Sequence, residues 1–296
     1  MIRKEHGLSG FEPVDMSGLQ RPVVCRKELV FGRGGDRDLT LDLFRPAKPE
    51  ERPLPVLVFI HGGGWGGGTK ESYHDLAARA ASRGYLCASV FYRLAGEAPF
   101  PAAIEDCKCA VRWVRSNAAE HGTDGEHIAV WGHSAGGHLA AMVALAPGKF
   151  EGEGGWQESS SAVQCAVCFS TPFDLTDKTS GLEGLVTQFI GPTPADRLRP
   201  AGGPAAEPDE IRRQASANTY VAGGKTLFLL FHGVEDVLPI SQSDRFAAAL
   251  RDAGVPVELV RVPGAGHDLE RFSPDLFTRA IAFLDKHLKP PGGGPR

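Results

Sequence analysis

The chain has 296 residues, of which 42% are hydrophobic and 23% are charged, a composition that lets it bury a large core and excludes a wholly disordered protein. Its formal net charge of −4 argues against a nucleic-acid partner and against attraction to anionic lipid. No apolar run approaches the roughly 18 residues that a membrane span needs, so we expect no association with a membrane.

The two ends of the chain differ from its middle. Residues 1–22 show no hydrophobic periodicity, and we interpret them as an N-terminal arm. A single domain is expected over 23–290, followed by a flexible tail over 291–296. Arg3 and Lys4 are not followed by an apolar stretch, so they do not form a secretory signal. We therefore expect a cytoplasmic protein, with a leader that has been removed as the alternative.

Hydrophobic patterning predicts two strands first and then an alternation of strands and helices. The first two strands are expected at 23–31 and 38–44, around a glycine turn. The later strands are expected at 55–60, 85–92, 127–131, 163–170, 226–232 and 256–262. Helices are expected at 72–83, 101–121, 241–253 and 274–288, with a small-residue helix that ends at residue 145.

Apolar strands that alternate with helices are typical of an α/β fold. Each such strand is buried on both faces, which requires a mostly parallel sheet covered by helices on both sides. Because strand-helix-strand crossovers are right-handed, the whole alternation fits one doubly wound sheet. The two strands before residue 55 would add an antiparallel edge.

The six cysteines are too few for a disulfide scaffold in a chain of this length. Cys165 and Cys168 lie three apart in a strand-like run, and Cys107 and Cys109 lie two apart on a helix. At either spacing the two thiols point in different directions. We expect all six to be reduced core residues.

Residues 132–136 read Gly-His-Ser-Ala-Gly, between an apolar strand and a small-residue helix. A serine at this junction can take a strained turn that exposes its hydroxyl, and the glycines leave room for the turn. The alternative is that Ser134 caps the helix, which serine does well. The context favours a nucleophile.

A serine hydroxyl needs an adjacent base. His267 follows the last predicted strand on a glycine loop, and Asp236 follows the strand before it. We expect His267 to be the base and Asp236 to hold its tautomer, with Glu235 as the rival acid and His232 as a residue that structures the loop. The chain order Ser134, acid, histidine is the one found in hydrolases built on such a sheet.

Residues 61–65 read His-Gly-Gly-Gly-Trp and follow the strand that ends at residue 60. Bare backbone N–H groups in a glycine loop can approach a carbonyl oxygen on which negative charge develops. We expect Gly63, Gly64 and Ala135 to donate to this oxyanion. A phosphate-binding loop is the alternative, but no Gly-Lys-Ser/Thr sequence follows.

Four segments, HGGGW, GHSAGGHLA, HGVEDVLPI and GAGHDL, together resemble the α/β-hydrolase superfamily over residues 23–288. They are most similar to its esterase branch, which includes hormone-sensitive-lipase-like enzymes and bacterial carbohydrate or feruloyl esterases. The resemblance implies an α/β-hydrolase fold, a small cap from residues 171–222, and no metal or organic cofactor. His133 stands where the lipase-like group more often has aspartate, which shifts the resemblance toward carbohydrate esterases and arylformamidase-like relatives.

Three aromatic residues and His133 are candidates for substrate binding, and Trp65 lies beside the glycine loop. We expect Trp65, Tyr92, Phe100 and His133 to line the pocket, with core packing or loop anchoring as the alternative. His138 lies one helical turn after Ser134 and is expected to pack rather than catalyse. His74, His121 and His127 show no spacing to carboxylates or cysteines that is typical of metal ligands.

These observations predict a serine hydrolase that cleaves carboxylic esters of short, acetyl or aromatic acyl groups through an acyl-enzyme. The expected partner is a small-molecule ester, and a homodimer is left open. One alternative is an arylformamidase-like amide hydrolase. The other is a hydrolase fold without catalysis, kept as a binding module.

Overall fold

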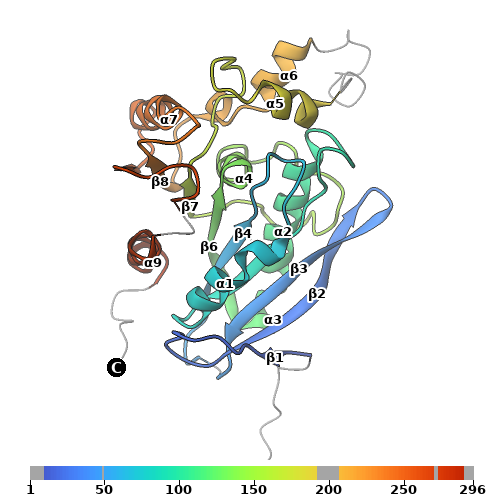
Figure 1. The fold of residues 1–296 in the computed structure, drawn as a ribbon. Helices are drawn as coiled ribbons and strands as arrows, with labels where there is room; N and C mark the ends of the chain where they lie inside the picture. The colour runs from blue at the N-terminus through green and yellow to red at the C-terminus, as the bar shows by residue number, and fades with distance from the viewer. Residues whose placement is uncertain (1–9, 49, 192–206, 270–272, 290–296) are drawn as a thin grey trace, which may run out of the picture.

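A computed structural model describes residues 10–48, 50–191, 207–269 and 273–289 (Figure 1). Its centre is a nine-stranded sheet in the order β1-β2-β3-β5-β4-β6-β7-β8-β9. From β5 to β9 every neighbouring pair is parallel, which confirms the expected doubly wound α/β sheet. These strands are β4 (Leu54–Ile60), β5 (Leu86–Val90), β6 (Thr123–His133), β7 (Cys165–Phe169), β8 (Leu227–Gly233) and β9 (Val257–Val262).

The antiparallel edge consists of β1 (Glu12–Pro13), β2 (Val23–Gly34) and β3 (Arg37–Pro46). β2 and β3 form the expected hairpin, and β3 then pairs antiparallel with β5. β1 pairs with the outer side of β2, so the described part of the N-terminal arm is docked on the sheet. Residues 1–9 and the tail 291–296 lie outside the described residues.

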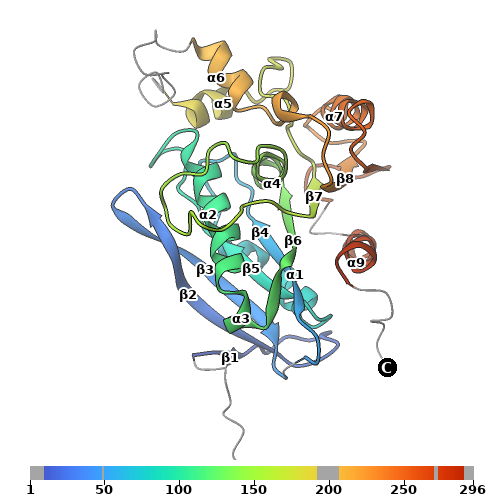
Figure 2. The same ribbon diagram turned by 180° about the vertical axis from the view of Figure 1, so that it is seen from behind.

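Alternate residues of the central strands serve two separate cores. In β4, Val56, Val58 and Ile60 face one cluster, whereas Leu57 and Phe59 face the other. The first cluster is covered by α2 (Ala102–Ser116), α4 (Ala135–Leu145) and α7 (Ser241–Asp252), as Figure 2 shows for α2 and α4. The second is covered by α1 (His74–Ala81) and α9 (Pro274–Leu288).

Two expected helices differ from the structure. The helix expected at 101–121 is divided at Asn117 into α2 and the short α3 (Ala118–His121). The Asn117 side-chain amide donates to the Trp113 carbonyl at 2.8 Å, and such local bonding by asparagine competes with a regular helix. The helix expected at 72–83 begins as a 3-10 turn, η1 (Lys70–Tyr73), before α1.

Residues from the 171–222 segment lie beyond the carboxyl ends of the parallel strands (Figure 1). They form α5 (Glu183–Ile190), α6 (Pro208–Gln214) and η3 (Ala217–Tyr220), and residues 192–206 lie outside the described part. Arg212 of α6 is paired with Glu183 of α5 through two hydrogen bonds. Phe189 and Ile211 join the first core cluster, so this segment, called the cap segment below, is packed against the sheet.

All six cysteines are buried and free, as the sequence predicted.

Among the helices of the described residues, none has both the length and the apolar character that crossing a bilayer requires.

Candidate active site

Ser134 lies at the sharp junction between β6 and α4. Its backbone has φ 54° and ψ −123°, a left-handed conformation that is costly for a residue with a side chain. Gly132 and Gly136 make the turn possible: a Cβ on Gly136 would lie 2.0 Å from the Ile60 carbonyl oxygen, and one on Gly132 would lie 2.3 Å from the Gly136 carbonyl carbon. The hydroxyl of Ser134 makes no helix-capping bond, which removes the capping alternative.

Two loops bring an imidazole and a carboxylate to this hydroxyl. His267 follows β9, and its Nε2 lies 3.0 Å from Ser134 Oγ. Its Nδ1 lies 2.9 Å from Oδ1 of Asp236, which follows β8. Because a carboxylate only accepts, Nδ1–H donates to Asp236, which leaves Nε2 free to accept the serine proton. The structure thus brings together all three residues expected to form the triad.

Asp236 is held as a carboxylate. Its side chain is fully buried, and burial alone would raise its pKa. Hydrogen bonds from the His267 ring and from the Leu238 N–H outweigh burial and hold the pKa of Asp236 below its usual value. Glu235, the rival acid, is exposed.

His232 supports the loop that carries Asp236. Its side chain is fully buried, with Nδ1 2.7 Å from the Ser243 hydroxyl. Its Nε2–H donates to the Leu238 carbonyl at 2.9 Å. His232 therefore structures this loop, as expected from the sequence.

The glycine loop after β4 presents backbone N–H groups beside the serine. Gly63 has φ +116° and Gly64 has φ +58°, and both line the cavity at Ser134. Ala135 is the first residue of α4. Within the described ranges, no protein acceptor pairs with the N–H of Gly63, Gly64 or Ala135. All three N–H groups are therefore left without an acceptor inside the described part of the protein.

A cavity of about 1300 Å³ opens above Ser134 and His267. On the cap side it is lined by Leu182 and Leu185, and Val237 lines it next to Asp236. Val237 is 85% exposed and Leu185 42% exposed, so apolar surface is offered at the mouth. The other end runs between α1 and α9, where Arg79 and Phe277 line it.

Three of the four residues expected to line the pocket lie elsewhere. Trp65, Tyr92 and Phe100 are each at most 1% exposed and do not line the cavity, which corrects the expectation. The left-handed backbone at Trp65, with φ +59°, accompanies a side chain buried between α4 and α5. Tyr92 donates to the His61 carbonyl at 2.9 Å, and Phe100 packs edge-on against Phe189.

His133 does line the cavity, but its ring is engaged within the protein. Its Nε2–H donates to the backbone carbonyl of His267 at 2.7 Å. Burial, and then repulsion from the neighbouring His267, lowers the pKa of His133 to about 4. The ring is therefore neutral at neutral pH and joins the serine turn to the loop of the base.

The sequence analysis did not predict that residues of the cap segment line the cavity. Leu185 comes from α5, and its Cδ2 lies 2.9 Å from where a Cβ on Gly64 would be. The only sequence signal for Val237 was its position directly after Asp236. Leu182 and Leu185 carried no such signal, because the cap segment has no strand register that could place them.

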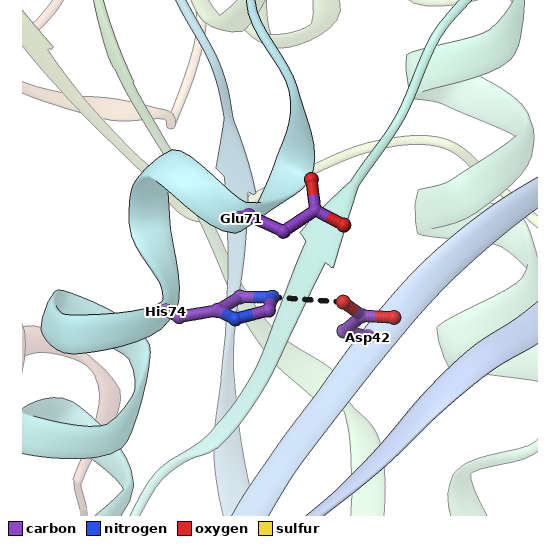
Figure 3. A group of neighbouring side chains, drawn as sticks. All are labelled: Asp42, Glu71 and His74. Carbon is purple, nitrogen blue, oxygen red and sulfur yellow. Dashed lines mark hydrogen bonds and ion pairs between the residues drawn. The ribbon is translucent and has the colours of Figure 1, made fainter. Parts of the chain in front are cut away.

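A second cluster of titratable groups lies under η1. Asp42, Glu71 and His74 bring their ligand atoms within 4.8 Å of one another (Figure 3), although their spacing gave no sign of it. His74 Nε2 lies 2.8 Å from Asp42. The ammonium of Lys70 lies 3.4 Å from Asp42 and 3.1 Å from Glu71 and also contacts Glu28. A side-chain cation thus already lies among these carboxylates, in a pattern typical of a structural ion-pair cluster.

Comparison with known proteins gives a family match over most of the sheet domain. The model of the BD-FAE family matches residues 41–250. Among curated proteins, the chain is 33% identical over 252 residues to esterase LipQ of Mycobacterium tuberculosis, covering 84% of this chain and 58% of that protein. It is 30% identical over 254 residues to esterase LipC of the same organism, covering 84% of this chain and 61% of that protein. The chain thus spans about three fifths of the length of these relatives.

Solved structures match nearly the whole chain. The apo form of Thermogutta terrifontis esterase 2 aligns with a TM-score of 0.75 and 26% identity over 98% of this chain and all of that one. The same esterase phosphorylated by paraoxon aligns with a TM-score of 0.73 and 25% identity over the same shares. A truncated carbohydrate esterase from gut microbiota gives 0.73 and 25% over 90% of this chain and 96% of that one. The fold is therefore that of these esterases, as the α/β-hydrolase resemblance predicted.

Proposed function

The chain belongs to the BD-FAE family, and from that membership we propose that it is a serine hydrolase that cleaves carboxylic esters of small molecules through an acyl-enzyme. One observation carries the proposal: Ser134, His267 and Asp236 form a continuous hydrogen-bonded row of 3.0 and 2.9 Å, of which Ser134 and His267 line the cavity. The names of the related esterases support the same reaction class.

The geometry is suited to acyl transfer in two steps. Ser134 Oγ attacks the ester carbonyl while its proton passes to His267 Nε2, and Asp236 stabilises the imidazolium that forms. The N–H groups of Gly63, Gly64 and Ala135 donate to the carbonyl oxygen as it becomes an oxyanion. The C–O bond then breaks, and the departing alkoxide takes the proton from His267.

The second step regenerates the enzyme. A water molecule attacks the acyl-serine while His267 removes its proton, and the second tetrahedral intermediate collapses to release the acid. His267 then returns the proton to Ser134 Oγ. Only the ester and water are consumed in this cycle, so the proposed reaction needs no cofactor.

The acyl group is proposed to be short, acetyl or aromatic. The cavity offers scattered apolar contacts from Leu182, Leu185 and Val237 at its mouth. Such an open apolar rim suits a small or planar acyl group better than a long chain, which needs a continuous apolar channel to bury it.

Replacement of Ser134 by alanine tests the proposal. We expect kcat for 4-nitrophenyl acetate to fall by at least about 10³-fold in Ser134→Ala, because the nucleophile is lost. Paraoxon should add one diethylphosphoryl group to the wild type and none to the variant, as read by intact mass. Ser116→Ala, an exposed serine on α2, is the matched control and should retain both properties.

Three outcomes would contradict the proposal. A Ser134→Ala variant with wild-type activity would remove the nucleophile assignment. Failure of paraoxon to label the wild type would favour a binding module without catalysis. Faster cleavage of N-formyl aromatic amides than of the matched esters would favour the amide-hydrolase alternative.

A further inference from the structure

His138 is a buried residue that contacts three parts of the proposed site. It lies on α4 one helical turn after Ser134, and its backbone N–H donates to the Ser134 carbonyl at 3.0 Å. Its side chain is completely buried. Trp65 Nε1–H donates to His138 Nδ1 at 3.1 Å, and His138 Nε2 lies 2.6 Å from the carbonyl of Ala215 in the cap segment.

The two bonds define the tautomer of this ring. An indole N–H can only donate, so His138 Nδ1 carries no proton. A carbonyl can only accept, so Nε2 carries the proton and donates to Ala215. Both bonds are satisfied only by the neutral imidazole. Burial also lowers the pKa of His138 to about 4, which keeps the ring in that form at neutral pH.

Trp65 needs an anchor because it follows a strained run. Gly63, Gly64 and Trp65 all have positive φ, at +116°, +58° and +59°. A tryptophan in the left-handed region persists only where its surroundings determine it. Its ring stacks on Phe189 of α5 with centroids 4.7 Å apart, and its only polar side-chain atom is bonded to His138.

The cap segment also packs against the glycine loop. A Cβ on Gly64 would lie 2.9 Å from Leu185, and one on Gly66 would lie 3.1 Å from Gln188. Both of these cap residues belong to α5, as does Phe189. The glycine loop is therefore in contact with α5, and the Trp65 that follows it is bonded to the His138 side chain.

We propose that His138 is a positioning residue: its neutral ring holds Trp65, and through Trp65 it keeps the N–H groups of Gly63 and Gly64 directed at the substrate carbonyl oxygen. The inference rests on the proposed function and adds to it. His138 does not touch the substrate, and it acts through Trp65. The Ala215 bond makes the cap segment part of the same support, so cap and oxyanion loop are positioned together.

Four variants test this role. His138→Leu removes both ring nitrogens, and His138→Asn keeps an acceptor near the Nδ1 position. Trp65→Phe removes the indole donor and keeps an aromatic ring. His121→Leu is the matched control, because His121 is also a buried histidine beside a tryptophan, Trp113, and does not line the cavity.

The measurement is kcat and KM for 4-nitrophenyl acetate, with active sites counted by paraoxon titration. Loss of one oxyanion donor lowers kcat by about 10²–10³-fold. In His138→Leu and Trp65→Phe the donors are displaced and not removed, so we expect kcat to fall by about 10–100-fold. KM should stay within about 3-fold, since the lost interaction is made in the transition state. His138→Asn should recover most of kcat, and the double variant His138→Leu/Trp65→Phe should be no worse than the poorer single one.

A role in packing alone would give a different result. The inference is overturned if His138→Leu keeps wild-type kcat per titrated site while its melting temperature falls as in His121→Leu. If His138→Leu does not fold, Trp65→Phe decides by the same criterion.

The indole N–H resonance of Trp65, assigned by its loss in Trp65→Phe, tests the bond without using activity. It should move upfield in His138→Leu, and an unchanged resonance would also overturn the inference. Failure of the proposed function would instead appear as wild-type activity that survives Ser134→Ala, with this resonance still behaving as expected.

Discussion

The imidazole of His133 donates a 2.7 Å hydrogen bond to the backbone carbonyl of His267, 134 residues away in the chain. The two rings lie 4.7 Å apart between centroids. This bond joins the turn that carries the proposed nucleophile to the loop that carries the proposed base, so the 3.0 Å contact between Ser134 and His267 does not depend on that loop alone.

Removal of the His133 donor should therefore slow the reaction. Misplacement of a reacting group by about 1 Å can cost 10²-fold, and we expect His133→Phe to lower kcat for 4-nitrophenyl acetate by about 10–100-fold. His133→Gln can still donate near the Nε2 position and should recover most of the rate. A fully active His133→Phe variant would show that the base loop holds its position without this bond.

Asp236→Asn should be far more damaging than the change of its neighbour. An amide at this position would favour the wrong tautomer of His267, and we expect kcat to fall by about 10⁴-fold. Glu235→Gln changes an exposed acid one residue away and is the matched control, expected within about 2-fold of the wild type because it removes no buried contact. Equal losses in both variants would contradict the assignment of Asp236.

Alanine at the two loop glycines should differ in severity. A Cβ on Gly63 would lie 2.4 Å from the Gly67 carbonyl oxygen, which is backbone, whereas one on Gly64 meets the end of the Leu185 side chain. We expect Gly63→Ala to lose more activity than Gly64→Ala and to have the lower melting temperature of the two. The added change Leu185→Ala should partly restore Gly64→Ala and should leave Gly63→Ala unimproved. Rescue of both glycine variants alike would contradict this steric account.

Acid should destabilise the fold over a defined pH range. Burial lowers the pKa of His61 and of His138 to about 4, and both side chains are fully buried. The unfolded chain therefore binds more protons than the native one between about pH 6.5 and 4, so the free energy of unfolding falls as pH is lowered through that range. Each histidine contributes a slope of about 1.4 kcal/mol per pH unit.

Urea unfolding at several pH values between 7 and 4 measures this slope. His138→Asn should reduce the slope of unfolding free energy against pH by the contribution of one histidine. This reduction is expected whether or not the variant is less stable than the wild type at pH 7. Asp236, whose pKa is lowered, contributes stability above pH 3.8 that is lost only below it, so the two effects separate along the pH axis. A stability that is constant from pH 7 to 4 would contradict the neutral state of these rings.

The local sequence was enough to predict the sheet and the edge at which the site lies. Strands with near-continuous apolar residues, such as Val56 to Ile60, can only be buried on both faces, and parallel strands end at one edge. Ser134, Asp236 and His267 each follow a different parallel strand, so their meeting followed from topology although 133 residues separate the first from the last. The glycines around Ser134 marked the turn for a steric reason that acts within a few residues.

Only the tertiary structure decided which way the remaining side chains point. Trp65 directly follows the glycine loop in sequence, but its backbone takes a left-handed conformation and its ring is buried against α5. Tyr92 and Phe100 are likewise buried and do not line the cavity. One partner of the Trp65 ring, His138, comes from α4, and the other, Phe189, comes from α5 of the cap, whose pattern carries no register. Side-chain direction depends on backbone dihedrals and on neighbours from distant segments, and neither is written in the spacing of residues along the chain.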